Sequence, residues 1–170
     1  QNWPEVLQIG LELYDSRGYR RESRSLVIDH KLRESDIDKG SQTVHGITIE
    51  QLRKGVSLFE AVSYFYRLKR QADFLVAHNY AFDSKVWTSN IMRSGYKQSE
   101  SEATSVQAIC TMKESTNICK IAGPYGNKWP KLQELYVWLF GEEFEGAHDA
   151  LADVQATAKC FFELKKRNLI

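Results

Sequence analysis

A run of four apolar residues, Phe74–Ala77, lies between two segments that are expected to form helices. The segment 58–71 has its apolar residues on one helical face and follows Ser57, a residue type that favours the start of a helix. The segment 81–94 is followed by Gly95, and glycine commonly ends helices. A short apolar run between two helices is typical of a buried strand. These segments therefore predict an α/β fold.

The two ends of the chain add a hairpin and a final helix. Residues 6–14 alternate after a short apolar start, and a second extended run follows at 25–28, after a turn that contains Gly18. A helix is expected from about Asp149, with apolar residues on one stripe and basic residues at its C-terminal end. A hairpin followed by alternating helices and strands predicts a mixed sheet with packed helices.

The stretches between these elements are predicted from shorter patterns. Residues 35–46 are polar and contain two glycines, which predicts a loop with a short helix. Residues 97–105 are rich in Ser and Glu and predict a mobile loop. We expect a further strand at 106–110, a turn at 123–126, and a helix over 130–140 with the proline in its first turn.

Composition bounds the class of protein without deciding its function. The 170 residues suit a single domain, 1–170, with no internal repeat or linker. Lys plus Arg total 23 and Asp plus Glu total 22, and this net charge of +1 neither requires nor excludes a nucleic-acid substrate. The sequence has no apolar run of membrane-helix length and no start resembling a signal peptide, so we expect a cytoplasmic protein without a membrane partner. The three cysteines form no C-x-x-C pair and are expected to be reduced thiols.

Two short segments, 78–83 and 148–153, combine histidine with aspartate. Asp83 follows the predicted buried strand, and Asp153 lies one turn inside the last predicted helix, after His148. Two carboxylates brought together repel each other unless a cation lies between them, and oxygen ligands favour Mg²⁺ or Mn²⁺. Such ions support phosphodiester hydrolysis, in which a neutral histidine can take the proton of the attacking water.

The second segment also has an interpretation without chemistry. His148 can be an ordinary residue before a helix, Asp149 its cap, and Asp153 a solvated surface carboxylate. A histidine and an aspartate at this spacing often occur together by chance. The chemical interpretation therefore depends on both segments occurring in one chain.

Four segments, in sequence order, resemble landmarks of the DEDDh family of 3′–5′ exonucleases, which includes RNase T and the proofreading subunit of bacterial DNA polymerase III. Residues 78–83 resemble the second motif of the family, and residues 148–153 resemble the third. Residues 3–10 resemble the strand that follows the first motif, and residues 44–48 resemble the loop between the first two motifs. The resemblance spans nearly the whole chain. It implies an α/β, ribonuclease H-like fold with a mixed five-stranded sheet flanked by helices.

The resemblance also implies roles for individual residues. Asp83 and Asp153 would be ligands of a divalent metal, with two Mg²⁺ or Mn²⁺ ions expected, and His148 would be the general base. The residues that would line the pocket for the 3′-terminal nucleotide are Val44, His45, Ile47, Asn79 and Phe82. Apolar side chains in this set offer a face to a base, and polar ones offer hydrogen bonds. Packing in the core is an equally good interpretation of Phe82 and Ile47.

The first motif of the family, Asp-x-Glu, does not occur in the sequence. Glu5 and Glu12 do not replace it, since Glu12 has Gly10 two residues before it where the motif needs Asp. We expect the motif on a strand upstream of Gln1, and weak metal binding without it.

The leading functional expectation is a metal-dependent exonuclease that acts on the 3′ end of single-stranded DNA or RNA, with DNA favoured and a DNA polymerase as a further candidate partner. One alternative is a catalytically impaired module of the same fold that binds nucleic acid or a partner protein. A phosphatase or phosphodiesterase for small molecules is another. A groove with aromatic platforms would favour nucleic acid over small molecules.

Overall fold

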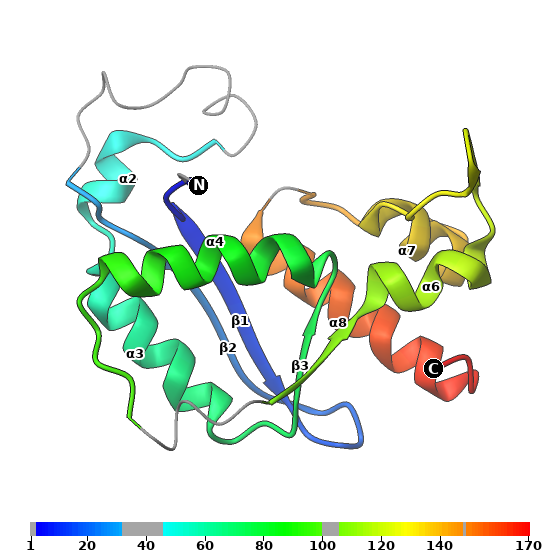
Figure 1. Cartoon of the computed structure of the whole chain (residues 1–170), viewed down its shortest axis with the longest axis horizontal. Coiled ribbons are helices and arrows are strands. Elements are labelled where there is room, and N and C mark those ends of the chain that lie inside the picture. The colour runs from blue at the N-terminus through cyan, green and yellow to red at the C-terminus, as the bar shows by residue number, and fades with distance from the viewer. Residues whose placement is uncertain (1–2, 32–45, 100–105, 148) are drawn as a thin grey trace.

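The computed structural model of the chain describes residues 3–31, 46–99, 106–147 and 149–170. In the view of Figure 1, the first two strands pass behind helix α4 (Tyr80–Arg93), and the last helix runs towards the lower right, where the chain ends. The expected loop at 35–46 falls almost wholly outside the described residues, as does most of the expected mobile loop at 97–105.

The first part of the chain forms the expected antiparallel hairpin of β1 (Gln8–Tyr14) and β2 (Arg20–Val27). The ladder runs from Gln8 opposite Val27 to Leu13 opposite Glu22 and shifts register before Tyr14. Asp15 shapes the turn because its Oδ1 accepts hydrogen bonds from the backbone N–H groups of Arg17 and Tyr19, both at 2.9 Å. The predicted hairpin is therefore confirmed, with a second strand longer than expected.

The middle of the chain alternates helices and strands. Helix α2 (Ile49–Arg53) precedes α3 (Leu58–Lys69), which begins at Ser57 as expected: the Ser57 hydroxyl accepts from the N–H of Glu60, and the Glu60 carboxylate accepts from the N–H of Ser57. Strand β3 (Phe74–Ala77) leads into α4 (Tyr80–Arg93). Strand β4 (Gln107–Cys110) pairs in parallel with β3 and leads into α6 (Thr111–Cys119).

The last part of the chain is mainly helical. A small hairpin of β5 (Ala122–Gly123) and β6 (Gly126–Asn127) occupies the predicted turn. Helix α7 (Leu132–Phe140) follows, and the chain ends with α8 (Ala150–Lys166). Pro130 lies before α7 rather than inside its first turn, because the helix begins after Lys131, whose N–H is bound by the carboxylate of Glu134 at 2.7 Å.

The predicted α/β architecture is confirmed, but its strands do not form one continuous sheet in the described part of the chain. They form three separate pairs, β1–β2, β3–β4 and β5–β6. Helix α8 packs against both β1 and β3 and so joins the first two pairs through side chains instead of a backbone ladder. In place of the expected sheet of five strands, the described residues form these three pairs.

Two clusters of buried side chains hold the elements together. One joins α7 to α8 and consists of Leu135, Tyr136, Leu139, Ala156, Cys160 and Leu164. The other joins α3 and α4 to the end of the hairpin and consists of Ile28, Ala61, Val62, Tyr66 and Trp87. All three cysteines are free thiols, as expected. Within the described ranges, no helix has both the length and the apolar character that crossing a membrane requires.

Candidate active site

The first of the two predicted motif segments forms the turn between β3 and α4. Asn79 caps the helix in the left-handed conformation, with φ 74° and ψ 41°, which asparagine tolerates better than most residues. Its carbonyl accepts hydrogen bonds from the N–H groups of Phe82 at 2.9 Å and Asp83 at 3.4 Å. The tight turn places Phe82 and Asp83 in the first turn of α4, directly after the C-terminal end of a parallel strand. Such strand ends are common ligand sites in α/β proteins.

Asp83 has the electrostatic character expected of a metal ligand. Its side chain reaches solvent, but the surrounding protein removes much of its water, and this desolvation raises the pKa of Asp83 to about 6. A cation near the carboxylate would offset that desolvation. A hard oxygen ligand of this kind fits Mg²⁺ or Mn²⁺.

Phe82, the neighbour of Asp83, offers a ring to solvent. The side chain is 49% exposed, and its ring meets the indole of Trp3 edge-to-face with centroids 6.0 Å apart. This exposure fits the expected contact with a nucleotide better than core packing does.

His78, the first residue of the same segment, has a structural position. Its Nε2 lies 2.9 Å from the carbonyl of Pro130, and since a carbonyl only accepts, Nε2 carries the proton. Its Nδ1 lies 3.0 Å from the hydroxyl of the fully buried Thr111 and accepts from it. Burial lowers the pKa of His78, which favours this neutral form. His78 therefore ties the end of β3 to the starts of α6 and α7.

The second motif segment begins α8. The carboxylate of Asp149 accepts hydrogen bonds from the N–H groups of Leu151 and Ala152, both at 3.0 Å, and caps the helix as expected. Asp153 follows in the first turn, where its N–H bonds to the carbonyl of Asp149 at 3.0 Å and its side chain is partly buried. The cap thus fixes the backbone that carries Asp153.

One face of strand β1 contacts the start of α8. The amide of Gln8 donates to Asp149 Oδ2 at 3.2 Å and to the hydroxyl of Ser25 at 2.8 Å. Two residues on, Gly10 lies against the start of α8: a Cβ there would come within 2.2 Å of the carbonyl oxygen of Ala150. Only glycine allows the strand and the helix to approach so closely.

Glu12, the next residue on this face, lies in a cage of polar side chains. Its side chain is 0% exposed, and its carboxylate accepts from Ser23 at 2.7 Å, Arg20 at 3.2 Å and Gln155 at 3.3 Å. The hydroxyl of Tyr14 also donates to it, and burial together with this carboxylate raises the pKa of Tyr14. The cage connects both strands of the hairpin to α8.

The remaining predicted residues divide between the core and the part of the chain that the structure leaves undescribed. Ile47 is only 6% exposed, so its side chain belongs to the core in this structure. Val44, His45 and His148 lie outside the described residues. Asp83 and Asp153 lie on the first turns of two helices that both pack against β3. Among the described residues, no group of three or more His, Cys, Asp or Glu side chains is arranged to hold a metal ion.

Sequence patterns missed the residues that position these helices. The sequence places His78 only within its segment, and it places Gln8 and Gly10 in a strand of the hairpin without indicating their contact with the last helix. The alternation of Gln8, Gly10 and Glu12 on one strand face was visible, but the helix that this face contacts lies about 140 positions away, as the separation of 141 between Gln8 and Asp149 illustrates.

A family model for exonucleases of the RNase T type matches residues 14–161 of the chain. The chain belongs to this exonuclease family. The resemblance to DEDD-type 3′–5′ exonucleases is thereby confirmed, and both motif segments lie within the matched residues. Exonucleases of this family generally use divalent metal ions. No curated protein sequence matches the chain significantly.

Solved structures of exonuclease I share the fold of this exonuclease domain. The E. coli enzyme in complex with a dA16 oligonucleotide has a TM-score of 0.71 and 18% identity, over 96% of this chain and 38% of that chain. A product-bound exonuclease I also has a TM-score of 0.71, with 16% identity over 96% of this chain and 40% of that chain. The chain therefore spans well under half of the length of these structures.

Proposed function

We propose that this exonuclease-family domain catalyses metal-dependent removal of nucleotides from the 3′ end of single-stranded nucleic acid, with DNA favoured over RNA. The observation that carries the proposal is the position of Asp83: a desolvated carboxylate with a pKa of about 6, in the first turn after a parallel strand. Membership of the exonuclease family supports the role of a metal ligand for that carboxylate, because exonucleases of this family generally use divalent metal ions.

The proposal assigns roles to residues of both motif segments, 78–83 and 148–153. Asp83 and Asp153 hold divalent ions, two Mg²⁺ or Mn²⁺ ions being expected, and His148 acts as the general base. When bound, such ions would neutralise charge at the phosphate and lower the pKa of the attacking water. The side chain of His148 accepts the proton of that water, since imidazole titrates near neutral pH. The Asp149 cap keeps the backbone between His148 and Asp153 in one conformation.

The 3′-terminal nucleotide occupies a pocket formed by Val44, His45, Asn79 and Phe82, and the buried Ile47 packs in the core instead of lining this pocket. The half-exposed ring of Phe82 is available for a base, and base stacking on aromatic rings does not depend on sequence. A single-stranded substrate is supported by the exonuclease I structure in complex with dA16, and the choice of DNA over RNA extends that likeness to this chain. Association with a DNA polymerase is part of the same proposal.

A second candidate is a catalytically impaired exonuclease-fold module that binds nucleic acid or a protein. It is supported by the half-exposed ring of Phe82 beside the indole of Trp3, since such rings can bind a base whether or not a strand is cleaved. The two candidates differ in turnover and not in binding.

Digestion of oligonucleotides by the full-length protein tests the proposal. Strands labelled at the 5′ end should yield a ladder that shortens from the 3′ end, and only with Mg²⁺ or Mn²⁺ present. Asp83→Ala and Asp153→Ala should each lower the rate at least about 100-fold, since each removes a proposed ligand. Asp73→Ala is the matched control, because Asp73 is an exposed aspartate at the other end of β3.

Three outcomes would contradict parts of the proposal. Full activity of Asp153→Ala would refute the metal site. Products that begin internally or at the 5′ end would refute the direction of attack. Tight binding without digestion by the full-length protein would establish the impaired module instead.

A further inference from the structure

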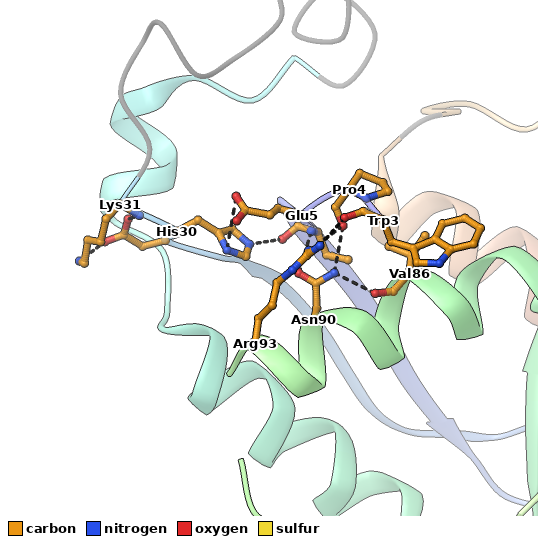
Figure 2. A network of polar contacts seen from close by, with 10 residues as sticks. Trp3, Pro4, Glu5, His30, Lys31, Val86, Asn90 and Arg93 are labelled. Atoms are coloured by element: carbon orange, nitrogen blue, oxygen red, sulfur yellow. Dashed lines mark hydrogen bonds and ion pairs between the residues drawn. The ribbon is translucent and has the colours of Figure 1, made fainter. Parts of the chain in front are cut away.

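The segment that leads into β1 is bound to α4 by hydrogen bonds from the side chains of Asn90 and Arg93. Figure 2 shows that Asn90, which is fully buried, donates to the carbonyl of Pro4 at 3.1 Å and to that of Val86 at 2.8 Å. Its side-chain oxygen accepts from the N–H of Val6 at 3.2 Å. Arg93 donates to the carbonyl of Trp3 at 2.6 Å. These bonds hold the backbone of Trp3 in one place on α4.

The clamped backbone sets the indole of Trp3 beside the candidate active site. The ring contacts Phe82, the neighbour of Asp83, and the Nζ of Lys85 lies 5.8 Å from the indole centroid. An open hollow of about 370 Å³ adjoins the indole, and its lining residues are Trp3, Ser84, Lys85, Thr88, Ser89 and Met92. These six comprise one aromatic ring, one cation, three hydroxyl groups and no carboxylate.

This combination matches the chemistry of a single-stranded nucleic acid. Bases stack on exposed aromatic rings, and cations and hydroxyls bind the phosphates between them. A lipid tail or an apolar peptide would have no use for the cation and the three hydroxyls. The ring of Trp3 also contacts Phe82, the residue proposed to bind the 3′-terminal nucleotide, so this aromatic pair connects the hollow with the proposed pocket.

We propose that the hollow beside Trp3 is a second nucleotide subsite, which binds a base of the strand upstream of the 3′-terminal nucleotide. Trp3 is the stacking platform, and Lys85 contacts the adjoining phosphate. The subsite rests on the proposed function, because it extends the same strand away from the same centre. The subsite predicts that Trp3 contributes more to the binding of long strands than to the binding of short ones.

Binding of 5′-labelled oligothymidylates of two, four and eight nucleotides, measured by fluorescence anisotropy in EDTA, tests the subsite without digestion. Trp3→Leu fills the space against Phe82 without an aromatic face, whereas Trp3→Phe keeps one. We expect Trp3→Leu to raise the Kd of the octamer about tenfold, with a smaller effect for Trp3→Phe and for the dimer. Lys85→Met should lower the slope of log Kd against log salt concentration by about one, the contribution of a single phosphate contact.

The matched control is Tyr19→Leu, because Tyr19 is an aromatic residue that is 63% exposed on the turn between β1 and β2. It should bind every length as the unmodified protein does. Where digestion is measured with metal, the effect of Trp3→Leu should fall on KM rather than on kcat.

The subsite and the exonuclease assignment fail in different ways. Equal Kd values for Trp3→Leu and Trp3→Phe, in a protein that digests strands, would overturn the subsite and leave the assignment intact. A length-dependent loss in Trp3→Leu, in a protein that digests nothing, would support the subsite and overturn the assignment. A fall in kcat without a change in Kd would overturn the subsite and make Trp3 a structural residue.

Discussion

Gly10 lies where β1 and α8 approach most closely, and its lack of a side chain is what makes the approach possible. A methyl group there would meet the carbonyl oxygen of Ala150 at 2.2 Å, a distance at which the backbone must move. Because Ala150 begins the helix that carries Asp153, a displacement at Gly10 is passed to the proposed metal site. One glycine in the hairpin thereby affects the position of a carboxylate in the last helix.

Gly10→Ala should lower the free energy of unfolding by about 3 kcal/mol, through overpacking against a backbone atom. Urea unfolding measures the change. Gly95→Ala is the control: Gly95 has a positive φ of 68° and open space around it, so its substitution should cost about 1 kcal/mol of backbone strain alone. Equal losses in the two variants would show that the close contact does not matter.

Asp83 makes a separate prediction about pH. Burial raises its pKa from 3.8 to about 6, so the folded state disfavours the ionised carboxylate. The destabilisation is absent below about pH 4, grows as pH rises towards 6, and is complete above it. In EDTA, Asp83→Asn should therefore have a higher Tm than the unmodified protein at pH 7, and a similar Tm at pH 4.

Thermal unfolding over this pH range measures the difference. Asp73→Asn serves as the control for the loss of one negative charge, since Asp73 is exposed. A constant difference in Tm between pH 4 and pH 7 would contradict the raised pKa. Divalent ions should reverse the order at pH 7, because a bound cation stabilises only the protein that keeps the carboxylate.

At the scale of single elements, the ends of the helices determine where the functional side chains lie. Helix α8 begins at Asp149, whose carboxylate binds two backbone N–H groups and the amide of Gln8. Helix α3 has an equivalent N-cap at Ser57, which belongs to neither of the two motif segments. The two caps allow the stability of a helix to be separated from the position of the residues next to it.

Asp149→Ala and Ser57→Ala should each lower the free energy of unfolding by about 1 kcal/mol, since each removes an N-cap. Only Asp149→Ala should also lower the exonuclease rate, because the cap lies between His148 and Asp153. Asp149→Asn, which can keep the cap, should restore most of both properties. Unfolding curves and initial rates measure the two effects, and a rate loss in Ser57→Ala as large as that in Asp149→Ala would contradict the positioning role.

Helix α6 illustrates what a local pattern misses. Its sequence, Thr111–Cys119, is rich in hydroxyl residues that favour turns, and no helix was expected there. In the structure, the hydroxyl of Ser115 donates to the carbonyl of Thr111 at 2.6 Å, and that of Thr116 to Met112 at 2.8 Å. The buried Thr111 also binds His78. Tertiary contacts thus overcome a weak local preference for helix.

At the scale of the whole molecule, α8 holds the separate strand pairs together. It contacts the hairpin through Glu12 and Gln155, the middle of the chain through β3, and α7 through a buried apolar cluster. Glu12 is the polar centre of this arrangement, since residues from both strands and from α8 donate to its buried carboxylate.

Glu12→Ala should lower the free energy of unfolding by about 2 kcal/mol, because it leaves several donors in and around the cage without an acceptor. Glu50→Ala is the control: Glu50 pairs with Lys54 on the surface, where such a pair contributes little. Chemical denaturation of both variants makes the comparison. A cost for Glu12→Ala no greater than that for Glu50→Ala would contradict the structural role of the cage.

The sequence alone was sufficient for features that depend on near neighbours. The Ser57 cap, the apolar strand Phe74–Ala77 and the start of α8 at Asp149 each follow from residues within one or two turns. The order of four segments, 3–10, 44–48, 78–83 and 148–153, was sufficient to indicate the exonuclease family. These properties are local, or are carried by the order of residues along the chain.

Only the tertiary structure decided how these pieces are positioned relative to one another. The contact of Gly10 with Ala150, the hydrogen bond between Glu12 and Gln155 across 143 positions, and the clamp of Asn90 on Pro4 across 86 positions leave no periodic trace in the sequence. The division of the strands into pairs has the same origin, because hydrogen bonds between strands depend on which segments the packed helices bring together. Residue type sets what a side chain can bind, and the packing of distant segments sets what it meets.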